Sequence, residues 1–124
     1  MSAGSYAQNL LLQYLLLGST GTRVTTWSVG LSLGSPSQAS LSEVGAGSGY
    51  ARKAVVFLSS NINTFTNTAA ITFGAFSTSA TMSGCFVVDS AGDLLLFGTL
   101  SPATAPAATS VAVFASGALK VVLS

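Results

Sequence analysis

The stretch "VVDSAGDLLLF", residues 87–97, places two apolar runs on either side of a short polar turn. In that turn Gly92 can adopt a positive φ, and the side chains of Asp89 and Asp93 can accept hydrogen bonds from turn amides. Two apolar runs joined in this way are typical of a β-hairpin. The stretch therefore predicts a pair of antiparallel strands, and it sets the fold class expected for the rest of the chain.

Similar short apolar runs recur from residue 23 onward. They are rich in Val, Ile, Phe, Thr or Leu and are bounded by Gly, Pro, Asn, Asp or Ser, without helical patterns between them. This arrangement predicts a mainly β protein, an antiparallel β-sandwich of about seven strands with a jelly-roll or immunoglobulin-like form. The expected strands are residues 23–33, 50–58, 69–76, 84–89, 93–100, 110–116 and 118–124, with exposed loops at 34–49 and 101–109.

The first of these strands alternates cleanly between large apolar and small residues. One face carries Trp27, Val29, Leu31 and Leu33, because alternate residues of a strand share a face. Trp27 is therefore expected to anchor the core.

The N-terminal segment "YAQNLLLQYLLLG", residues 6–18, predicts a short helix that ends at Gly18. Its apolar run is far shorter than the ~20 residues that cross a bilayer, and no basic residue precedes it as in a signal peptide. We expect a helical arm at residues 1–22 and a β-sandwich domain at 23–124. Leucines on nearly every side require more than one covering surface, and a partner subunit is a candidate for one of them. The predicted interface residues on this helix are Tyr6, Leu10, Tyr14 and Leu17.

Charge is scarce in this chain of 124 residues, which has four basic and three acidic residues and a net charge of +1. So little basic density argues against nucleic-acid binding. Either Ser, Thr and Gly coat the surface, or partner subunits cover much of it. The hydrophobic share of 49% favours the second interpretation, because a bare apolar surface aggregates. We therefore expect a homo-oligomer.

Candidate catalytic and metal-binding residues are few. The chain has no His, so neither a Ser-His-Asp triad nor a Cys-His pair can form. The single Cys85 is expected to be a buried strand residue, and zinc-type spacing is absent. Asp89 and Asp93 are interpreted as turn residues rather than calcium ligands. The sequence predicts no enzyme activity, no cofactor and no metal.

The stretch "EVGAGSGYARKAVVF", residues 43–57, combines glycines with two basic residues. It does not predict a phosphate site, because a strand follows the glycines where a helix N-terminus is needed. Arg52 and Lys53 are adjacent in that strand and point to opposite faces. They form either an inter-subunit contact or two solvated charges. Tyr50 and Arg52 share a face and are candidates for a packing and pairing anchor.

The order of these motifs resembles that of short tailed-bacteriophage virion proteins of the tail-fibre-like or capsid-decoration type. Their pattern is a W-x-v-x-L strand, E-v-s-g-g-x-Y-x-R, N-t-a-x-v-x-F and a terminal G-a-L-x-v-x-L. Here "TTWSVGLSL", "EVGAGSGYAR", "NTAAITF" and "GALKVVL" stand in the same order over residues 23–124. The resemblance implies a non-enzymatic, trimeric component of the phage virion.

Two placements in the particle are open. A capsid cement protein bridges major-capsid subunits on the outer surface, whereas a tail-fibre or baseplate module attaches the particle to its host. The chain has neither repeats nor coiled-coil heptads, and its expected loops carry no aromatic residues before Tyr50. The sequence therefore favours the cement role. The expected partners are further copies of the chain and the major capsid protein or other virion proteins, with no nucleic acid and no membrane. The protein would be made in the host cytoplasm and would lie on the outer surface of the virion.

Overall fold

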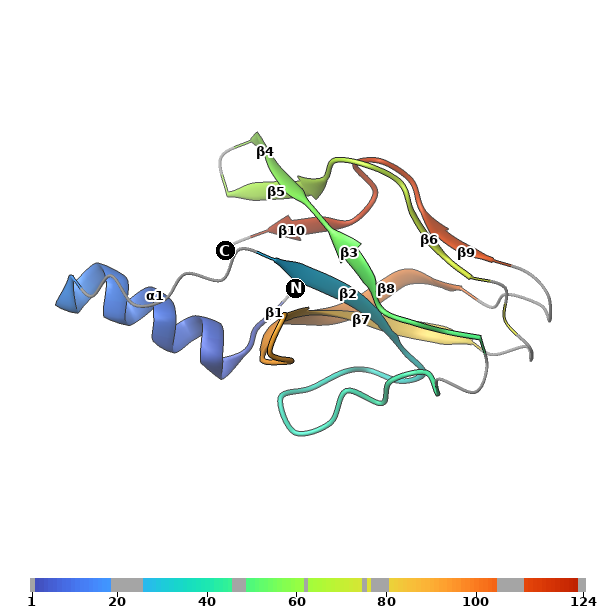
Figure 1. The fold of residues 1–124 in the computed structure, drawn as a ribbon, viewed down its shortest axis with the longest axis horizontal. Coiled ribbons are helices and arrows are strands. Elements are labelled where there is room, and N and C mark those ends of the chain that lie inside the picture. Colours follow the sequence, from blue (N-terminus) through green and yellow to red (C-terminus); the bar gives the residue numbers. More distant parts are fainter. Residues whose placement is uncertain are drawn as a thin grey trace.

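The computed structural model describes residues 2–18, 26–45, 49–61, 63–74, 76, 81–104 and 111–122, with 101–104 described by their backbone only. Within these residues lie one helix and ten strands (Figure 1). Their bounds are β1 Ser2–Ala3, α1 Ser5–Leu17, β2 Trp27–Ser32, β3 Lys53–Val55, β4 Phe57–Asn61, β5 Thr64–Asn67, β6 Ile71–Phe73, β7 Met82–Asp89, β8 Leu94–Thr104, β9 Ala112–Phe114 and β10 Lys120–Val122.

The strands form two layers (Figure 1). One layer is a five-stranded antiparallel sheet in the order β1-β8-β7-β2-β3, and the other holds two smaller antiparallel sheets, β10-β5-β4 and β6-β9. The core lies between them, with Val29, Leu31 and Val87 from the large sheet facing Ile71 and Phe73 from the second layer. The prediction of a mainly β sandwich with one short N-terminal helix is confirmed.

The hairpin that decides the fold class is formed by β7 and β8. The Asp89 carboxylate accepts hydrogen bonds from the backbone N–H groups of Ala91 and Asp93, both at 2.9 Å. Gly92 has a φ of 91°, and its N–H donates to the Asp89 carbonyl oxygen at 3.1 Å. Local turn chemistry therefore closes this hairpin as the sequence predicts.

The buried face predicted for β2 is confirmed in part, and Gly30 and Ser32 on its other face are buried as well. Val29 and Leu31 are buried, and Trp27 is half-buried and packs against the core. Leu33 is 48% exposed, because β2 ends at Ser32 and the chain turns away there.

Several expected strand boundaries are wrong. The strand expected at 50–58 is two strands, because the chain leaves the large sheet after β3 and enters the second layer at β4. A single exposed residue, Val56, separates the two. The short strands β1 and β5 were not predicted, because neither contains an apolar run.

The two expected loops also differ from the prediction. β8 continues to Thr104, so the first residues of the loop expected at 101–109 belong to a strand, and 105–109 lie outside the described residues. In the loop expected at 34–49, Pro36 and Val44 are buried rather than exposed. They are buried because the segment folds back on the large sheet, where Glu43 forms an isolated bridge with Ser32. Residues 46–48 lie outside the described residues.

Asn67 connects the two smaller sheets. Its side-chain amide donates to the carbonyl oxygens of Ala69 and Ala115 at 2.8 and 3.0 Å, and its oxygen accepts from the N–H of Leu119 at 2.9 Å. Its backbone N–H donates to the Leu119 carbonyl oxygen, and its own carbonyl oxygen accepts from Gly117. The side chain is 2% exposed, and every polar atom in it is hydrogen-bonded.

The predicted helix is present as α1 and ends where expected. Gly18 follows it with a φ of 62°, a conformation in which glycine avoids the strain of a side chain. None of the thirteen residues of α1 is buried. The arm was expected at 1–22, but β1, which precedes the helix, pairs with β8 in the large sheet. Residues 19–25 lie outside the described part of the chain.

Candidate interface surfaces

The outer edge of β2 is completed by two different segments. β3 pairs with the first three residues of β2 only. Beyond them the N–H of Leu31 donates to the Tyr50 hydroxyl at 3.0 Å, and the Leu31 carbonyl oxygen accepts from the N–H of Val44 at 3.1 Å. The N–H of Leu33 donates to the Ser42 carbonyl oxygen at 2.9 Å. Residues 42–44 and the Tyr50 side chain therefore cover an otherwise open sheet edge.

A polar cluster holds this segment in place, and we call Gly30, Glu43, Tyr50, Arg52 and Phe86 the Glu43 cluster. The Arg52 guanidinium donates from Nε to Glu43 Oε1 and from Nη2 to Oε2, both at 2.8 Å. The Tyr50 hydroxyl donates to Glu43 Oε1 at 2.9 Å. The guanidinium carbon also lies 5.4 Å from the centroid of the Phe86 ring, within the range of a cation–π contact. Glu43 thus accepts three charge-assisted hydrogen bonds.

Gly30 makes the close approach in this cluster possible. It faces Phe86 across the β2–β7 pair. A methyl group added to Gly30 would overlap atoms of the Phe86 ring and lie 2.7 Å from the Tyr50 hydroxyl oxygen. The space that a side chain would occupy at this position is filled by Phe86 and Tyr50.

Tyr50 links the cluster to the apolar core. Its ring stacks on Phe73 with centroids 5.9 Å apart, and Phe73 meets Phe114 edge-on at 6.1 Å. Tyr50 is therefore both a buried packing residue and the hydrogen-bond partner of Leu31 and Glu43.

The electrostatics of the cluster favour one protonation state. Hydrogen bonds from Arg52 hold the pKa of the Glu43 carboxyl below its ordinary value; burial opposes this effect and the Tyr50 hydroxyl adds to it. The same ion pair raises the pKa of Arg52. Burial raises the pKa of the Tyr50 phenol well above its ordinary value, so the hydroxyl stays neutral and able to donate.

The variant Glu43→Gln should lower the free energy of unfolding by about 1–2 kcal/mol at pH 7, because it removes the ionised acceptor. The pKa of the Glu43 carboxyl is lower in the folded state than its ordinary value of 4.5. The ionised carboxylate therefore stabilises the fold fully above pH 4.5, and this stabilisation is lost as the pH falls through the folded-state pKa. Urea unfolding followed by Trp27 fluorescence should show the gap between wild type and variant closing below about pH 4.5.

The variant Arg52→Met is the matched control. It removes the cation that lowers the pKa of Glu43, so its stability should depend less on pH over the same interval. A gap between wild type and Glu43→Gln that is the same at pH 7 and pH 3 would contradict this assignment.

The predicted interface residues fall in separate places. Arg52 and Tyr50 come together through Glu43, whereas Lys53 is half-buried on β3, opposite Val29 in register. Arg52 is engaged within its own chain by the ion pair with Glu43. A contact of Arg52 or Lys53 with another subunit stays a prediction.

The predicted residues on α1 differ in exposure. Tyr6 and Leu10 are half-buried, and α1 contacts β8. Tyr14 and Leu17, farther along the helix, are 66% and 77% exposed. Their role in an interface also stays a prediction.

Sequence reasoning did not select Glu43, Gly30 and Phe86 as site residues. Glu43 could have been selected from the sequence, because it is one of only three acidic residues and lies close to Tyr50 and Arg52. The positions of Gly30 and Phe86 carry no such signal, because their contact depends on the pairing of β2 with β7.

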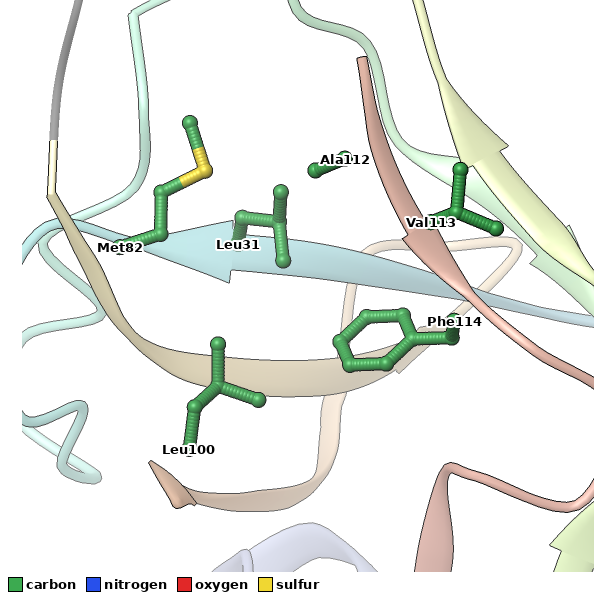
Figure 2. Close-up of a pocket in the computed structure, with 6 residues that line it drawn as sticks. All are labelled: Leu31, Met82, Leu100, Ala112, Val113 and Phe114. Carbon is green, nitrogen blue, oxygen red and sulfur yellow. The ribbon is translucent and has the colours of Figure 1, made fainter. Parts of the chain in front are cut away.

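A small apolar cavity lies between β9 and the strands of the large sheet (Figure 2). Its volume of about 30 Å³ leaves room for about one water molecule, whereas organic ligands occupy several hundred Å³. We therefore do not interpret it as a ligand site. Its lining residues are Leu31, Met82, Leu100, Ala112, Val113 and Phe114.

The described residues contain no group of three or more His, Cys, Asp or Glu placed to hold a metal ion. Cys85 is buried, and burial raises the pKa of its thiol to about 11, so the thiolate is disfavoured. In the described part of the chain, no helix is long and apolar enough to cross a membrane.

The structure combines a two-layer β fold, a partly exposed polar cluster that fixes a loop and an exposed apolar helix. The family model described as Podophage GP4 fiber I protein gp80 matches residues 2–122, and the chain belongs to this family. It is therefore a structural protein of a tailed-phage virion, of the tail-fibre type, and the resemblance drawn from the sequence is confirmed. A comparison with curated proteins found no match.

Proposed function

We propose that the protein is a non-enzymatic module of a phage tail fibre, exposed on the outer surface of the particle, and that it contributes to host attachment. The observation that carries this proposal is the match to a fibre-protein family, which spans α1 and the β strands through β10. The sequence alone favoured a capsid cement protein. The family match instead favours the tail-fibre alternative, which we adopt.

The fold is suited to a rigid module in a larger assembly. The Glu43 cluster holds the segment that covers the edge of β2, and the Asn67 hydrogen bonds connect the two smaller sheets. Among the described residues neither connection uses a disulfide. On the β10-β5-β4 sheet, Leu58 and Val122 are exposed on one face and Phe65 on the other. Exposed apolar side chains of this kind offer contacts to neighbouring proteins.

Immunoelectron microscopy of intact virions tests the placement. Gold-labelled Fab fragments raised against the purified chain should bind at the tail, and the same Fab fragments should slow adsorption of phage to host cells. Fab fragments against an unrelated protein are the control. Labelling spread over the capsid, with unchanged adsorption, would contradict the tail proposal and support the cement role.

Copy number gives a second measurement. Quantitative mass spectrometry of purified virions should find far fewer copies of this chain than of the major capsid protein. A copy number comparable to that of the major capsid protein would contradict the tail placement.

A further inference from the structure

The first turn of helix α1 lacks a cap from its own sequence. The N-cap residue Gly4 has no side chain, and the first turn contains no acidic residue. The first N–H groups of a helix have no partner inside the helix and need acceptors from elsewhere. The Ser5 N–H donates to Oε1 of Gln38, 33 residues later in the chain, at 2.8 Å. Gln38 therefore takes the place of a side-chain N-cap for α1.

The start of α1 lies between β8 and Gln38. The N–H of Gly4 donates to the Leu95 carbonyl oxygen at 2.7 Å. A methyl group added to Gly4 would overlap the Leu94 carbonyl oxygen and lie 3.2 Å from Oε1 of Gln38. Glycine thus allows both neighbours to approach closely, and the start of α1 is positioned by β8 on one side and by Gln38 on the other.

The segment that carries this acceptor, residues 34–44, is compact, and we call it the strap (Figure 1). The Ser37 N–H donates to the Ser40 carbonyl oxygen at 2.8 Å, and the Ser40 N–H donates to Oγ of Ser37 at 3.2 Å. Pro36 is buried against β7, where a methyl group added to Gly84 would overlap the proline ring. The strap is therefore a preformed loop that packs on the large sheet and reaches α1 at its tip.

The base of the strap is held by the Glu43 cluster. Ser42, next to Glu43, has a φ of 48°, a left-handed conformation that strains a residue with a side chain. Such a conformation persists only where the surrounding contacts impose it. Here these contacts are the hydrogen bonds of the strap to β2 and the ion pair of Glu43 with Arg52 at 2.8 Å. The Glu43 and Arg52 side chains are 28% and 38% exposed, so protons from the solvent reach the carboxylate.

We propose that the strap is an acid-sensitive switch that couples the Glu43–Arg52 ion pair to helix α1. With Glu43 ionised, the base of the strap stays on the edge of β2, and Gln38 caps α1. Protonation of Glu43 removes the ion pair, so the base of the strap leaves the edge of β2 and Gln38 leaves the Ser5 N–H. Because β1 remains paired with β8, α1 stays attached while its first turn loses order. The proposal does not depend on the tail placement.

The charges around Glu43 make it the group that titrates in this switch. Its hydrogen-bond partners, Arg52 and the Tyr50 hydroxyl, both have a raised pKa and keep their protons in acid. The charged residues of the neighbouring strands, Lys53 and Asp89, pair with the first three residues of β2, whereas Glu43 bridges its last residue. β2 and α1 contain no charged side chain. Arg52 holds the pKa of the Glu43 carboxyl below its ordinary value of 4.5, so the strap is closed at neutral pH and opens below pH 4.5.

Hydrogen exchange of single backbone N–H groups, measured by NMR on the full chain at pH 7, tests the coupling. Glu43→Gln imitates the protonated carboxyl. It should speed exchange at Val44, which reports the base of the strap, and at Ser5, which reports α1, each at least about 3-fold. Arg52→Met should have the same effect, because it removes the ion pair from outside the strap. The Gly92 N–H, in the β7–β8 turn, should keep its wild-type rate.

Three further variants separate the tip of the strap from its base. Gln38→Ala removes the acceptor at the tip, so it should speed exchange at Ser5 and leave Val44 unchanged. Gln38→Glu should keep slow exchange at Ser5, since a carboxylate is also an acceptor and is favoured at a helix N-terminus. Gln13→Ala makes the same change on the exposed second half of α1, and both rates should stay at their wild-type values.

Acid provides the same comparison without a substitution. In wild type, protection at Ser5 and Val44, taken relative to the intrinsic exchange rate at each pH, should fall together below pH 4.5. In Glu43→Gln the protection at both positions should already be low at pH 7 and should change little with acid.

Four results would overturn the proposal. The first two are a wild-type exchange rate at Ser5 in both Glu43→Gln and Arg52→Met, and a wild-type rate at Ser5 in Gln38→Ala. The third is a loss of protection in acid that is equal in wild type and Glu43→Gln. The fourth is an equal rise at Gly92 in Glu43→Gln, because the variant would then loosen the whole sandwich instead of the strap.

Discussion

Replacing Asn67 with aspartate is expected to lower the free energy of unfolding by about 3–5 kcal/mol at pH 7. The amide nitrogen of Asn67 donates to the carbonyl oxygens of Ala69 and Ala115, and aspartate places an oxygen there instead. Two carbonyl groups then lose their donor and face a buried negative charge, or the carboxyl must take up a proton. Urea unfolding at pH 7 measures the loss.

The dependence on pH separates this mechanism from a simple loss of packing. Protonation restores one donor to the aspartate, and the buried site favours the neutral form, so the folded-state pKa of this carboxyl lies above its unfolded value. The variant Asn67→Asp should therefore recover stability relative to Asn67→Ala as the pH falls from 7 to 4. A constant difference between the two variants over this range would contradict the mechanism.

Asn9→Asp is the control for the change of residue type, because Asn9 is exposed on α1. It makes the same chemical change without burying a charge. Its effect on the free energy of unfolding should be within about 0.5 kcal/mol.

Local chemistry explains which parts of the fold the sequence predicts well. The β7–β8 hairpin depends on Asp89 and Gly92, both inside the turn, so its signal lies within a few residues. The alternation of β2 and the stop at Gly18 are local in the same sense. The hairpin and the helix end were predicted correctly, and the buried face of β2 was predicted in part.

The missed elements depend on distant partners. β5, "TFTN", lies between polar residues and becomes a strand because β4 and β10 pair with it on both sides. The passage between layers at Val56 interrupts an apolar run without a glycine or proline, so no residue marks it. The exposure of α1 is equally hidden, because an apolar pattern does not say which chain covers it.

The Glu43 cluster is predicted from the sequence only in part. Tyr50 and Arg52 were selected because both lie on one face of a strand, and the opposite charge of Glu43 was visible nearby. Glu43 can accept hydrogen bonds from Tyr50 and Arg52 only because the segment that contains Glu43 folds back on β2. Gly30 and Phe86 join the cluster through strand pairing alone.

Gly30 is the position in the Glu43 cluster where an added methyl group would overlap its neighbours. Gly30→Ala places a methyl group against the Phe86 ring and 2.7 Å from the Tyr50 hydroxyl oxygen. Accommodation requires Phe86, Tyr50 or the backbone of β2 to move. We expect a loss of about 2–4 kcal/mol in the free energy of unfolding, as for overpacking with a displaced hydrogen bond. Gly45→Ala is the control, since its added methyl group meets no atom within 4 Å; the expected change is within about 0.5 kcal/mol.

A double-mutant cycle with Tyr50→Phe tests whether the hydroxyl is the group that the methyl displaces. Tyr50→Phe alone should cost about 1–3 kcal/mol, because the N–H of Leu31 loses its acceptor and Glu43 loses a donor. If Gly30→Ala already breaks these hydrogen bonds, the double variant should cost less than the sum of the single variants by at least about 1 kcal/mol. Additive losses would show that the methyl group acts on Phe86 alone and that the Tyr50 hydroxyl keeps its partners. Tyr50→Phe keeps the ring that stacks on Phe73, so the cycle reports on the hydroxyl group and not on the packing of the core.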